Sequence, residues 1–153
     1  NQILDEMCAA LGGRAAEQVT FGEISTGALS DLEKVTKQAY AMVSIYGLNE
    51  KVGNISFYDS QGRSEYSFSK PYSEDTAKTI DEEASKIIEF QYQRAIKLLT
   101  DNQDKLNALA EKLLQKEVIF KEDLVAIFGE RPWDRLEPEE QIKEAAKEIL
   151  END

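Results

Sequence analysis

Residues 2–19 have the sequence QILDEMCAALGGRAAEQV, in which apolar side chains recur at every third or fourth position. Positions with this spacing share one face of an α-helix. The face consists of Ile3, Leu4, Met7, Cys8, Leu11, Ala15, Ala16 and Val19. Gly12 and Gly13 interrupt the run and together cost about 1–2 kcal/mol relative to alanine, which is tolerable if another backbone packs close to them. The chain is therefore expected to begin as a helix.

A loop and a second helix are predicted next. Residues 21–30, FGEISTGALS, are rich in Gly, Ser and Thr, as loops are. The helix is expected to begin at Ser30, because Ser30 and Glu33 have the spacing of a capping box. Its apolar positions are Val35, Ala39, Met42 and Val43. Gly47 is expected to end it.

Residues 71–129 are predicted to form a helical body. The apolar face of its first, long helix consists of Ala77, Ile80, Ala84, Ile87, Ile88, Tyr92, Ala95 and Leu99. Residues 100–103 have the spacing of another capping box and would open a helix that ends at Leu114. The apolar stripe of that helix is Leu106, Leu109, Ala110, Leu113 and Leu114. A short helix over 122–128 is expected to end at Gly129.

The fold class that follows is all-α, with helices joined by short loops and packed through their apolar faces. Residues 48–70 are an irregular connection, with at most a short β hairpin around residues 52–68. Its first strand would be Ile55-Ser56-Phe57-Tyr58. Residues 134–153 are expected to be an acidic helical tail, and Trp133 to anchor the end of the fold.

Composition excludes several classes of partner. The 153 residues carry a net charge of −12 without a basic stripe, so neither nucleic acid nor an anionic membrane surface is an expected partner. The sequence contains no run of about 18 apolar residues, which is the length needed to span a membrane. Cys8 is the single cysteine, so no disulfide can form within the chain, and its helical spacing predicts a buried thiol.

The sequence contains no histidine, which excludes Ser-His-Asp and Cys-His catalysis and every metal site with two histidines in this chain. It also contains no glycine-rich phosphate loop, so no nucleotide site is expected here. The acidic runs at 81–83 and 137–140 are typical of solvated helix faces. Asp31 lies at a predicted helix start, where the helix dipole favours a carboxylate by about 0.3–1 kcal/mol. On local physics alone, Asp31 has a structural role.

Several motifs occur in a fixed order: LGGRAAE at 11–17, STGA at 25–28, DLE at 31–33, YGL at 46–48 and IFGERPW at 127–133. With these motifs, residues 1–133 resemble the C-terminal part of the protease domain of the FtsH family of membrane-anchored, ATP-dependent zinc proteases. Within that part, the resemblance implies that residues 1–47 form the helices bearing a zinc ligand.

In that family, two histidines and a glutamate lie in a His-Glu-x-x-His helix, and an aspartate at the start of a later helix is the third zinc ligand. The resemblance places that ligand at Asp31. Ser30 stands where the family usually has asparagine, a mild departure because serine also caps helices. The His-Glu-x-x-His segment is expected upstream of residue 1, so this chain alone is expected to have no peptidase activity and no high-affinity zinc site.

For the parent protein, the resemblance implies zinc and ATP as cofactors, unfolded or membrane proteins as substrates, and assembly as a homo- or hetero-hexamer. It also implies a membrane anchor in an N-terminal segment, with this domain on the cytoplasmic side in bacteria or the matrix side in mitochondria. The alternative is a non-catalytic helical module derived from the protease, which the absence of histidine favours. A start inside a helix, without a cap, argues against a stand-alone module.

Overall fold

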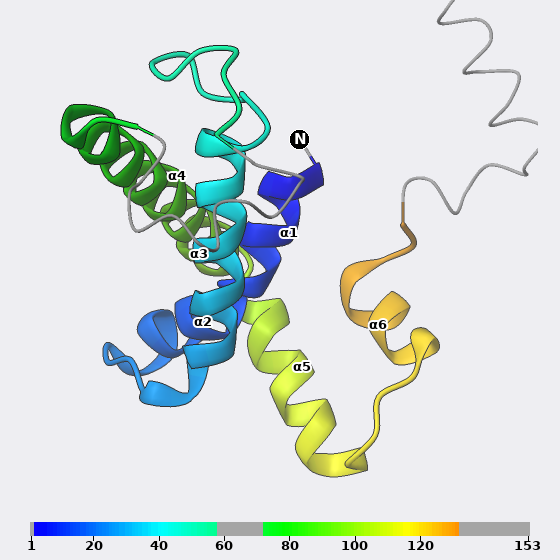
Figure 1. Cartoon of the computed structure of the whole chain (residues 1–153). Helices are drawn as coiled ribbons and strands as arrows, with labels where there is room; N and C mark the ends of the chain where they lie inside the picture. Colours follow the sequence, from blue (N-terminus) through cyan, green and yellow to red (C-terminus); the bar gives the residue numbers. More distant parts are fainter. Residues whose placement is uncertain (1, 58–71, 132–153) are drawn as a thin grey trace, which may run out of the picture. The chain divides into compact units, whose positions relative to one another are not determined.

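The computed structural model describes residues 2–57 and 72–131, which divide after Asp101 into two compact units (Figure 1). The elements of the first unit are α1 (Gln2–Ala10), α2 (Gly12–Phe21), the 3-10 helix η1 (Thr26–Ala28), α3 (Leu29–Ser44) and α4 (Glu74–Asp101). Those of the second are α5 (Gln103–Lys116) and α6 (Lys121–Phe128). No strand occurs within the described ranges, and the predicted all-α class is confirmed.

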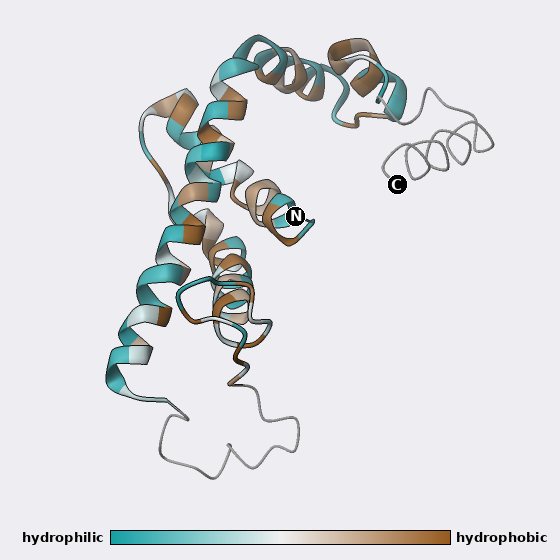
Figure 2. Ribbon diagram, turned by 90° about the horizontal axis from the view of Figure 1, so that it is seen from above, coloured by the Kyte–Doolittle hydropathy of each residue, from teal (hydrophilic) through white to brown (hydrophobic). Residues whose placement is uncertain are grey.

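The first unit is organised around α4, against which α1, α2 and α3 all pack, while α1 also packs against α3. Figure 2 shows hydrophobic and hydrophilic residues alternating around this helix, as the sequence spacing predicts. Since α4 is 28 residues long, at about 1.5 Å per residue it can receive three helices along its length. None of the helices in the described ranges has the length and apolarity needed to cross a bilayer.

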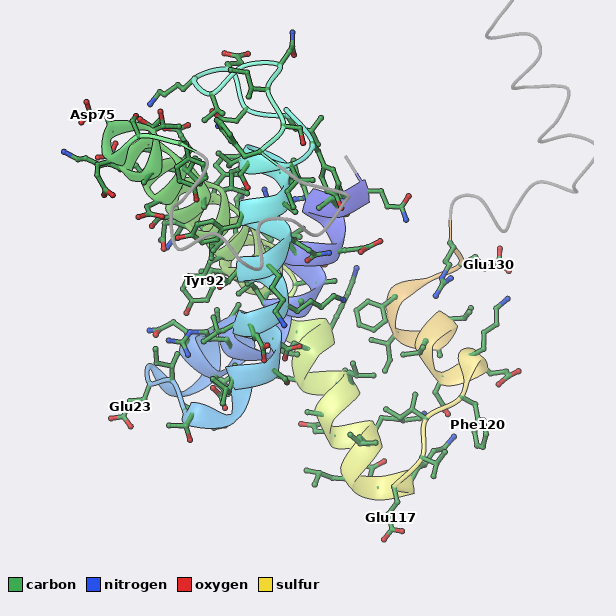
Figure 3. All side chains as sticks on the ribbon, in the orientation of Figure 1. Glu23, Asp75, Tyr92, Glu117, Phe120 and Glu130 are labelled. Atoms are coloured by element: carbon green, nitrogen blue, oxygen red, sulfur yellow. The ribbon has the colours of Figure 1, made fainter. Side chains whose placement is uncertain are left out.

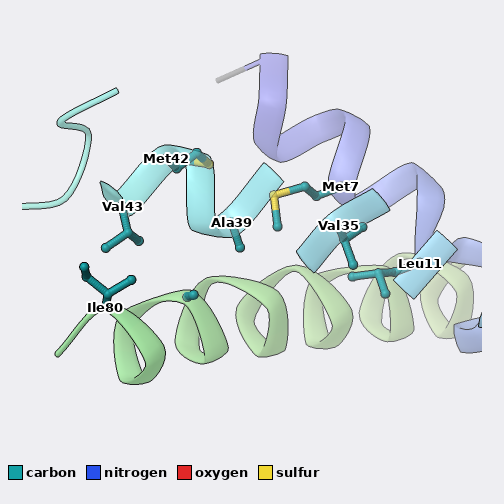
Figure 4. Close-up of a cluster of buried hydrophobic side chains, with 8 residues drawn as sticks. Met7, Leu11, Val35, Ala39, Met42, Val43 and Ile80 are labelled. Carbon is teal, nitrogen blue, oxygen red and sulfur yellow. The ribbon is translucent and has the colours of Figure 1, made fainter. Parts of the chain in front are cut away.

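The core of this unit is a cluster of buried apolar side chains contributed by α1, α3 and α4 (Figure 4). Its members are Met7, Leu11, Val35, Ala39, Met42, Val43, Ile80 and Ala84. A smaller cluster contains Cys8, Ala15 and Ala95, and the predicted burial of the Cys8 thiol is confirmed. Burying one large aliphatic side chain is worth about 1.5–3 kcal/mol, so the first cluster is the main source of stability.

The predicted run over 2–19 is divided at Leu11 into α1 and α2. Leu11 is itself buried, and its amide still donates to the carbonyl of Met7 at 3.0 Å, so the bend does not interrupt the core face. The condition that another backbone packs close to the two glycines is not met among the described residues. A Cβ atom added at Gly12 or Gly13 would meet no atom of the described chain within 4 Å.

Both predicted capping boxes are wrong. Helix α3 begins at Leu29, directly after η1, so the Ser30 side chain has no exposed first turn to cap, and Glu33 pairs instead with Lys37 at 2.6 Å. Helix α4 continues to Asp101, because its apolar face extends to Leu99. The hydroxyl of Thr100 therefore donates back to the carbonyl of Ile96 at 2.8 Å rather than capping a new helix.

The connection after α3 is irregular, as predicted. Gly47 has the left-handed backbone conformation (φ +63°) that ends the helical region. Residues 52–57 contain no strand, and the amide of Phe57 donates to the carbonyl of Ser44 at 2.8 Å. The remainder of the predicted hairpin lies outside the described residues.

In the second unit, α6 ends before Gly129 as predicted, and its Asp123 accepts hydrogen bonds from the Phe120 amide and the Lys116 ammonium group. Figure 3 shows the side chains of Glu117 and Phe120 projecting from the turn between α5 and α6. Helix α5 has no buried residue, so the predicted stripe is not a core face of the described part of this unit; Leu114 is 84% exposed. Trp133 and the 134–153 tail lie outside the described residues.

Candidate metal-ligand site at the start of α3

The candidate site lies where the chain leaves α2, reverses direction and enters α3. Helix α2 ends at Gly22, whose left-handed conformation (φ +73°) lets the backbone turn away from the helix axis. The Gly22 amide donates to the carbonyl of Gln18 at 3.1 Å, and the Gln18 side-chain amide donates to the Gly22 carbonyl at 3.3 Å. These two bonds fix the point at which the loop begins.

Glu17 in α2 binds Ser25 at the far end of this loop. One oxygen of Glu17, Oε1, accepts from the Ser25 hydroxyl at 2.6 Å, and the other, Oε2, accepts from the Ser25 amide at 3.0 Å. The hydroxyl bond, followed by the amide bond, holds the pKa of the Glu17 carboxyl below its ordinary value. The residue is therefore ionised at neutral pH and bound through both oxygens.

Ser25 in turn begins the helical structure that carries the candidate ligand. Its backbone is extended, and its hydroxyl oxygen accepts from the Gly27 amide at 3.2 Å, so Ser25 is the N-cap of η1. Leu29, which follows η1, already has helical angles (φ −58°, ψ −47°) and starts α3. The two helical segments are thus continuous.

Asp31 is in the first turn of α3, and the predicted placement at a helix start is confirmed. Its side chain is partly exposed. Within the described ranges, no hydrogen bond or ion pair involves its carboxylate. The neighbouring carboxylates of Glu17 and Glu33 are both bound, to Ser25 and Lys37. Asp31 therefore has a partly exposed carboxylate in the first turn of a helix that packs in the core of this unit.

The described residues do not contain a complete zinc site. Catalytic zinc takes three protein ligands and keeps a fourth position for water. No group of three or more His, Cys, Asp or Glu side chains that could hold a metal occurs in the described ranges. A carboxylate oxygen is a suitable zinc ligand, so the chemistry of the Asp31 side chain is compatible with one ligand position.

A second polar feature lies further along α3. Gln38 lines a hollow of about 330 Å³ between α1 and α3, together with Ile3, Lys37, Ala41 and Tyr46. Its side-chain nitrogen donates to Glu6 at 3.3 Å, while its oxygen is buried without a partner among the described residues. A buried amide oxygen without a donor is costly, so this surface is suited to being covered by a group that donates a hydrogen bond.

Sequence reasoning identified Asp31 but missed the Glu17–Ser25 pair and the Gln38 oxygen. Glu17 and Ser25 are eight positions apart across a loop, a spacing that belongs to neither helical nor strand periodicity. Gln38 lies among polar neighbours on α3. Both contacts depend on how α1, α2 and α3 are arranged, which no local pattern specifies.

Comparison with known proteins supports the family inferred from the motifs. The pattern of peptidase family M41 matches residues 1–127. An "ATP-dependent zinc metalloprotease FtsH" of Parabacteroides distasonis is 55% identical over 132 residues, covering 86% of this chain and 19% of that protein.

Eukaryotic relatives are also similar. The mitochondrial "ATP-dependent zinc metalloprotease FTSH 3" of Oryza sativa is 48% identical, covering 90% of this chain and 17% of its own length. The "mitochondrial inner membrane m-AAA protease component AFG3L2" of Mus musculus is 43% identical, covering 99% of this chain and 19% of its own. The chain thus spans about a fifth of the length of these relatives. With the match over residues 1–127 and the ordered motifs, the chain belongs to peptidase family M41, the FtsH family of proteases.

Proposed function

We propose that this chain is part of the proteolytic domain of an ATP-dependent zinc metalloendopeptidase, and that Asp31 supplies the third protein ligand of its zinc ion. The accessible Asp31 carboxylate in the first turn of α3 is the observation that carries the assignment. The names of the relatives, which are zinc metalloproteases, support the choice of metal.

The division of roles follows from what the chain contains. Zinc in such a site activates its bound water for attack on a carbonyl group. Asp31 would hold the metal through one carboxylate and add negative charge to the ligand set. The chain has no histidine, so two histidine ligands and the glutamate general base of a His-Glu-x-x-His helix would come from outside these 153 residues. The isolated chain is accordingly proposed to be inactive.

The properties of the whole protein are part of the same proposal. ATP hydrolysis by a separate module would deliver unfolded or membrane-extracted proteins to the site. The Mus musculus relative, named as a component of a mitochondrial inner membrane protease, favours a membrane-anchored parent. The cytoplasmic or matrix side is the proposed location of this domain. A ring of six subunits is the proposed assembly, since head-to-tail contacts that close produce such rings.

A non-catalytic helical module derived from the protease is the second candidate. It is favoured by the absence of histidine in the sequence and by the absence of a three-ligand group in the described ranges. A module of this kind would assemble or bind without any need for Asp31.

The test compares the full-length protein with its Asp31→Asn variant in ATP-dependent degradation of an unfolded protein, with zinc counted in both. Asp104→Asn is the matched control, because Asp104 lies in the first turn of α5. The proposal predicts that Asp31→Asn loses zinc and at least about 100-fold in activity, since even residues that only support a ligand cost 10–100-fold. Asp104→Asn should retain both. If both variants keep zinc and activity, Asp31 is only a helix-start residue and the third ligand lies elsewhere. A full-length wild-type protein with neither degradation nor zinc would favour the non-catalytic module.

A further inference from the structure

We propose that Glu17 is a positioning residue for Asp31: by binding Ser25 through both carboxylate oxygens, it fixes the point at which the helical segment carrying Asp31 begins. This inference rests on the proposed role of Asp31 as a zinc ligand. It assigns Glu17 no contact with the metal or the substrate.

The first step is the geometry of the Glu17–Ser25 contact. The two oxygens of Glu17 lie 2.6 Å from the Ser25 hydroxyl and 3.0 Å from the Ser25 amide nitrogen. Two charge-assisted hydrogen bonds to one residue fix its orientation as well as its position. Since both oxygens are used, Glu17 is arranged as a clamp on the loop rather than as a ligand.

The second step is that the clamp is attached to the core. Glu17 lies in α2, two residues after Ala15, which is fully buried in a cluster with Cys8 and with Ala95 of α4. Movement of α2 would therefore disrupt packing against the longest helix of the unit. Through Glu17, the loop residue Ser25 is thus attached to a helix that is packed into the core.

A continuous helical segment connects Ser25 to Asp31. Ser25 caps η1 by accepting from the Gly27 amide at 3.2 Å, and η1 passes directly into α3. Asp31 follows Ser25 by six positions, all of which lie in η1 or α3. Because the segment has no break, a shift of Ser25 is transmitted to the Asp31 carboxylate.

The same loop provides a matched control. Glu23 is exposed, and Figure 3 shows its side chain projecting outward from the loop between α2 and η1. No hydrogen bond or ion pair joins Glu23 to any other described residue. Glu23→Gln therefore removes one negative charge, as Glu17→Gln does, from the adjoining loop without removing a contact to Ser25.

The experiment uses the full-length protein with the substitutions Glu17→Gln, Ser25→Ala, Ser25→Thr and Glu23→Gln, and Asp31→Asn in parallel. Zinc dissociation into a chelator, kcat and KM for an unfolded protein, and the ATPase rate are measured. Glu17→Gln and Ser25→Ala should each accelerate zinc loss by about 10–100-fold and lower kcat, with KM and the ATPase rate unchanged. Ser25→Thr, which keeps the hydroxyl, and Glu23→Gln should behave as wild type.

Combining the two changes supplies a stricter test. If Glu17 acts only through Ser25, the double variant Glu17→Gln/Ser25→Ala should lose zinc no faster than either single variant. Zinc loss in Glu17→Gln with full retention in Ser25→Ala would overturn the positioning role, because the Ser25 hydroxyl, which makes the shorter of the two bonds to Glu17, would then contribute nothing. If Glu17→Gln does not fold, the comparison of Ser25→Ala with Ser25→Thr decides the question.

The two proposals fail differently. Full zinc retention in Asp31→Asn would overturn the proposed function and this inference with it. Zinc loss in Asp31→Asn, with Glu17→Gln and Ser25→Ala both equal to Glu23→Gln, would overturn the positioning role alone.

Discussion

The ammonium nitrogen of Lys51 lies 2.6 Å from Oε1 of Glu83 and ties the irregular connection after α3 to the middle of α4. Glu83 also accepts from Lys86 at 2.8 Å and from the Asn49 side-chain amide at 3.1 Å. Only 13% of the Glu83 side chain is exposed. Hydrogen bonds from Lys51, then Lys86 and Asn49, lower the pKa of the Glu83 carboxyl to about 2. One carboxylate therefore holds the connection in place.

This contact predicts a specific pH dependence of stability. A carboxyl whose folded-state pKa is depressed stabilises the fold fully above its unfolded pKa, and that stabilisation is lost as pH falls through the folded pKa. For Glu83 the window runs from 4.5 down to about 2. In urea unfolding of this chain, the stability gap between wild type and Glu83→Gln should be constant above pH 4.5 and shrink below it. The exposed neighbour Glu82→Gln is the control and should show a much smaller gap; a pH-independent gap for Glu83→Gln would contradict the account.

Substituting one buried and one exposed leucine tests which apolar residues form the core. Leu11 is 2% exposed and Leu114 is 84% exposed. Leu11→Ala should lower the free energy of unfolding by about 2–5 kcal/mol, because it removes buried methyl groups and leaves a cavity. Leu114→Ala should stay within about 0.5 kcal/mol of wild type. Chemical denaturation of both variants measures the difference, and similar losses would show that the stripe of α5 is covered in solution.

Two glycines should respond to alanine with opposite signs. Gly13 lies inside α2 with open space around it, so Gly13→Ala should stabilise the chain by about 0.5–1 kcal/mol through helix propensity. Gly47 has φ +63°, so Gly47→Ala should destabilise it by about 1–2 kcal/mol. Thermal unfolding of the two variants provides the measurement. Destabilisation by Gly13→Ala would mean that some other surface does pack against this glycine.

Periodicity accounts for the part of the fold that sequence could predict. Met7, Leu11, Val35 and Ile80 were all identified by three- and four-residue spacing, and all are buried, because a core face needs only that its residues share a side of a helix. The helix boundaries were harder to predict from the sequence. Ser30 has the sequence of a cap but lies inside a helical region that η1 has already begun.

Sequence periodicity also could not show which apolar helix faces are covered by other elements. The stripe containing Leu114 is as regular as that containing Leu11, yet none of its residues is buried and Leu114 is 84% exposed. The placement of Asp31 in a first helical turn followed from local rules. The contact of Glu17 with Ser25 did not, because it depends on the reversal of the chain at Gly22. The role of Asp31 as a zinc ligand remains a prediction.

The 153-residue chain alone should bind zinc weakly. Asp31 offers one ligand, and a catalytic site needs three. Equilibrium dialysis of the isolated chain at neutral pH should therefore show no stoichiometric zinc at micromolar metal, with Asp31→Asn indistinguishable from wild type. One zinc per chain that is lost on Asp31→Asn would show that these residues form a complete site by themselves.

The most direct test of the central claim is a zinc-bound structure of the full-length protein, with the metal located by its anomalous scattering. The account predicts a single zinc ion within ordinary bonding distance of an Asp31 carboxylate oxygen, about 2.0–2.2 Å. It also predicts that Glu17 lies outside the ligand set with both oxygens still on Ser25. A zinc ion held entirely by other residues, with the Asp31 carboxylate in solvent, would contradict it.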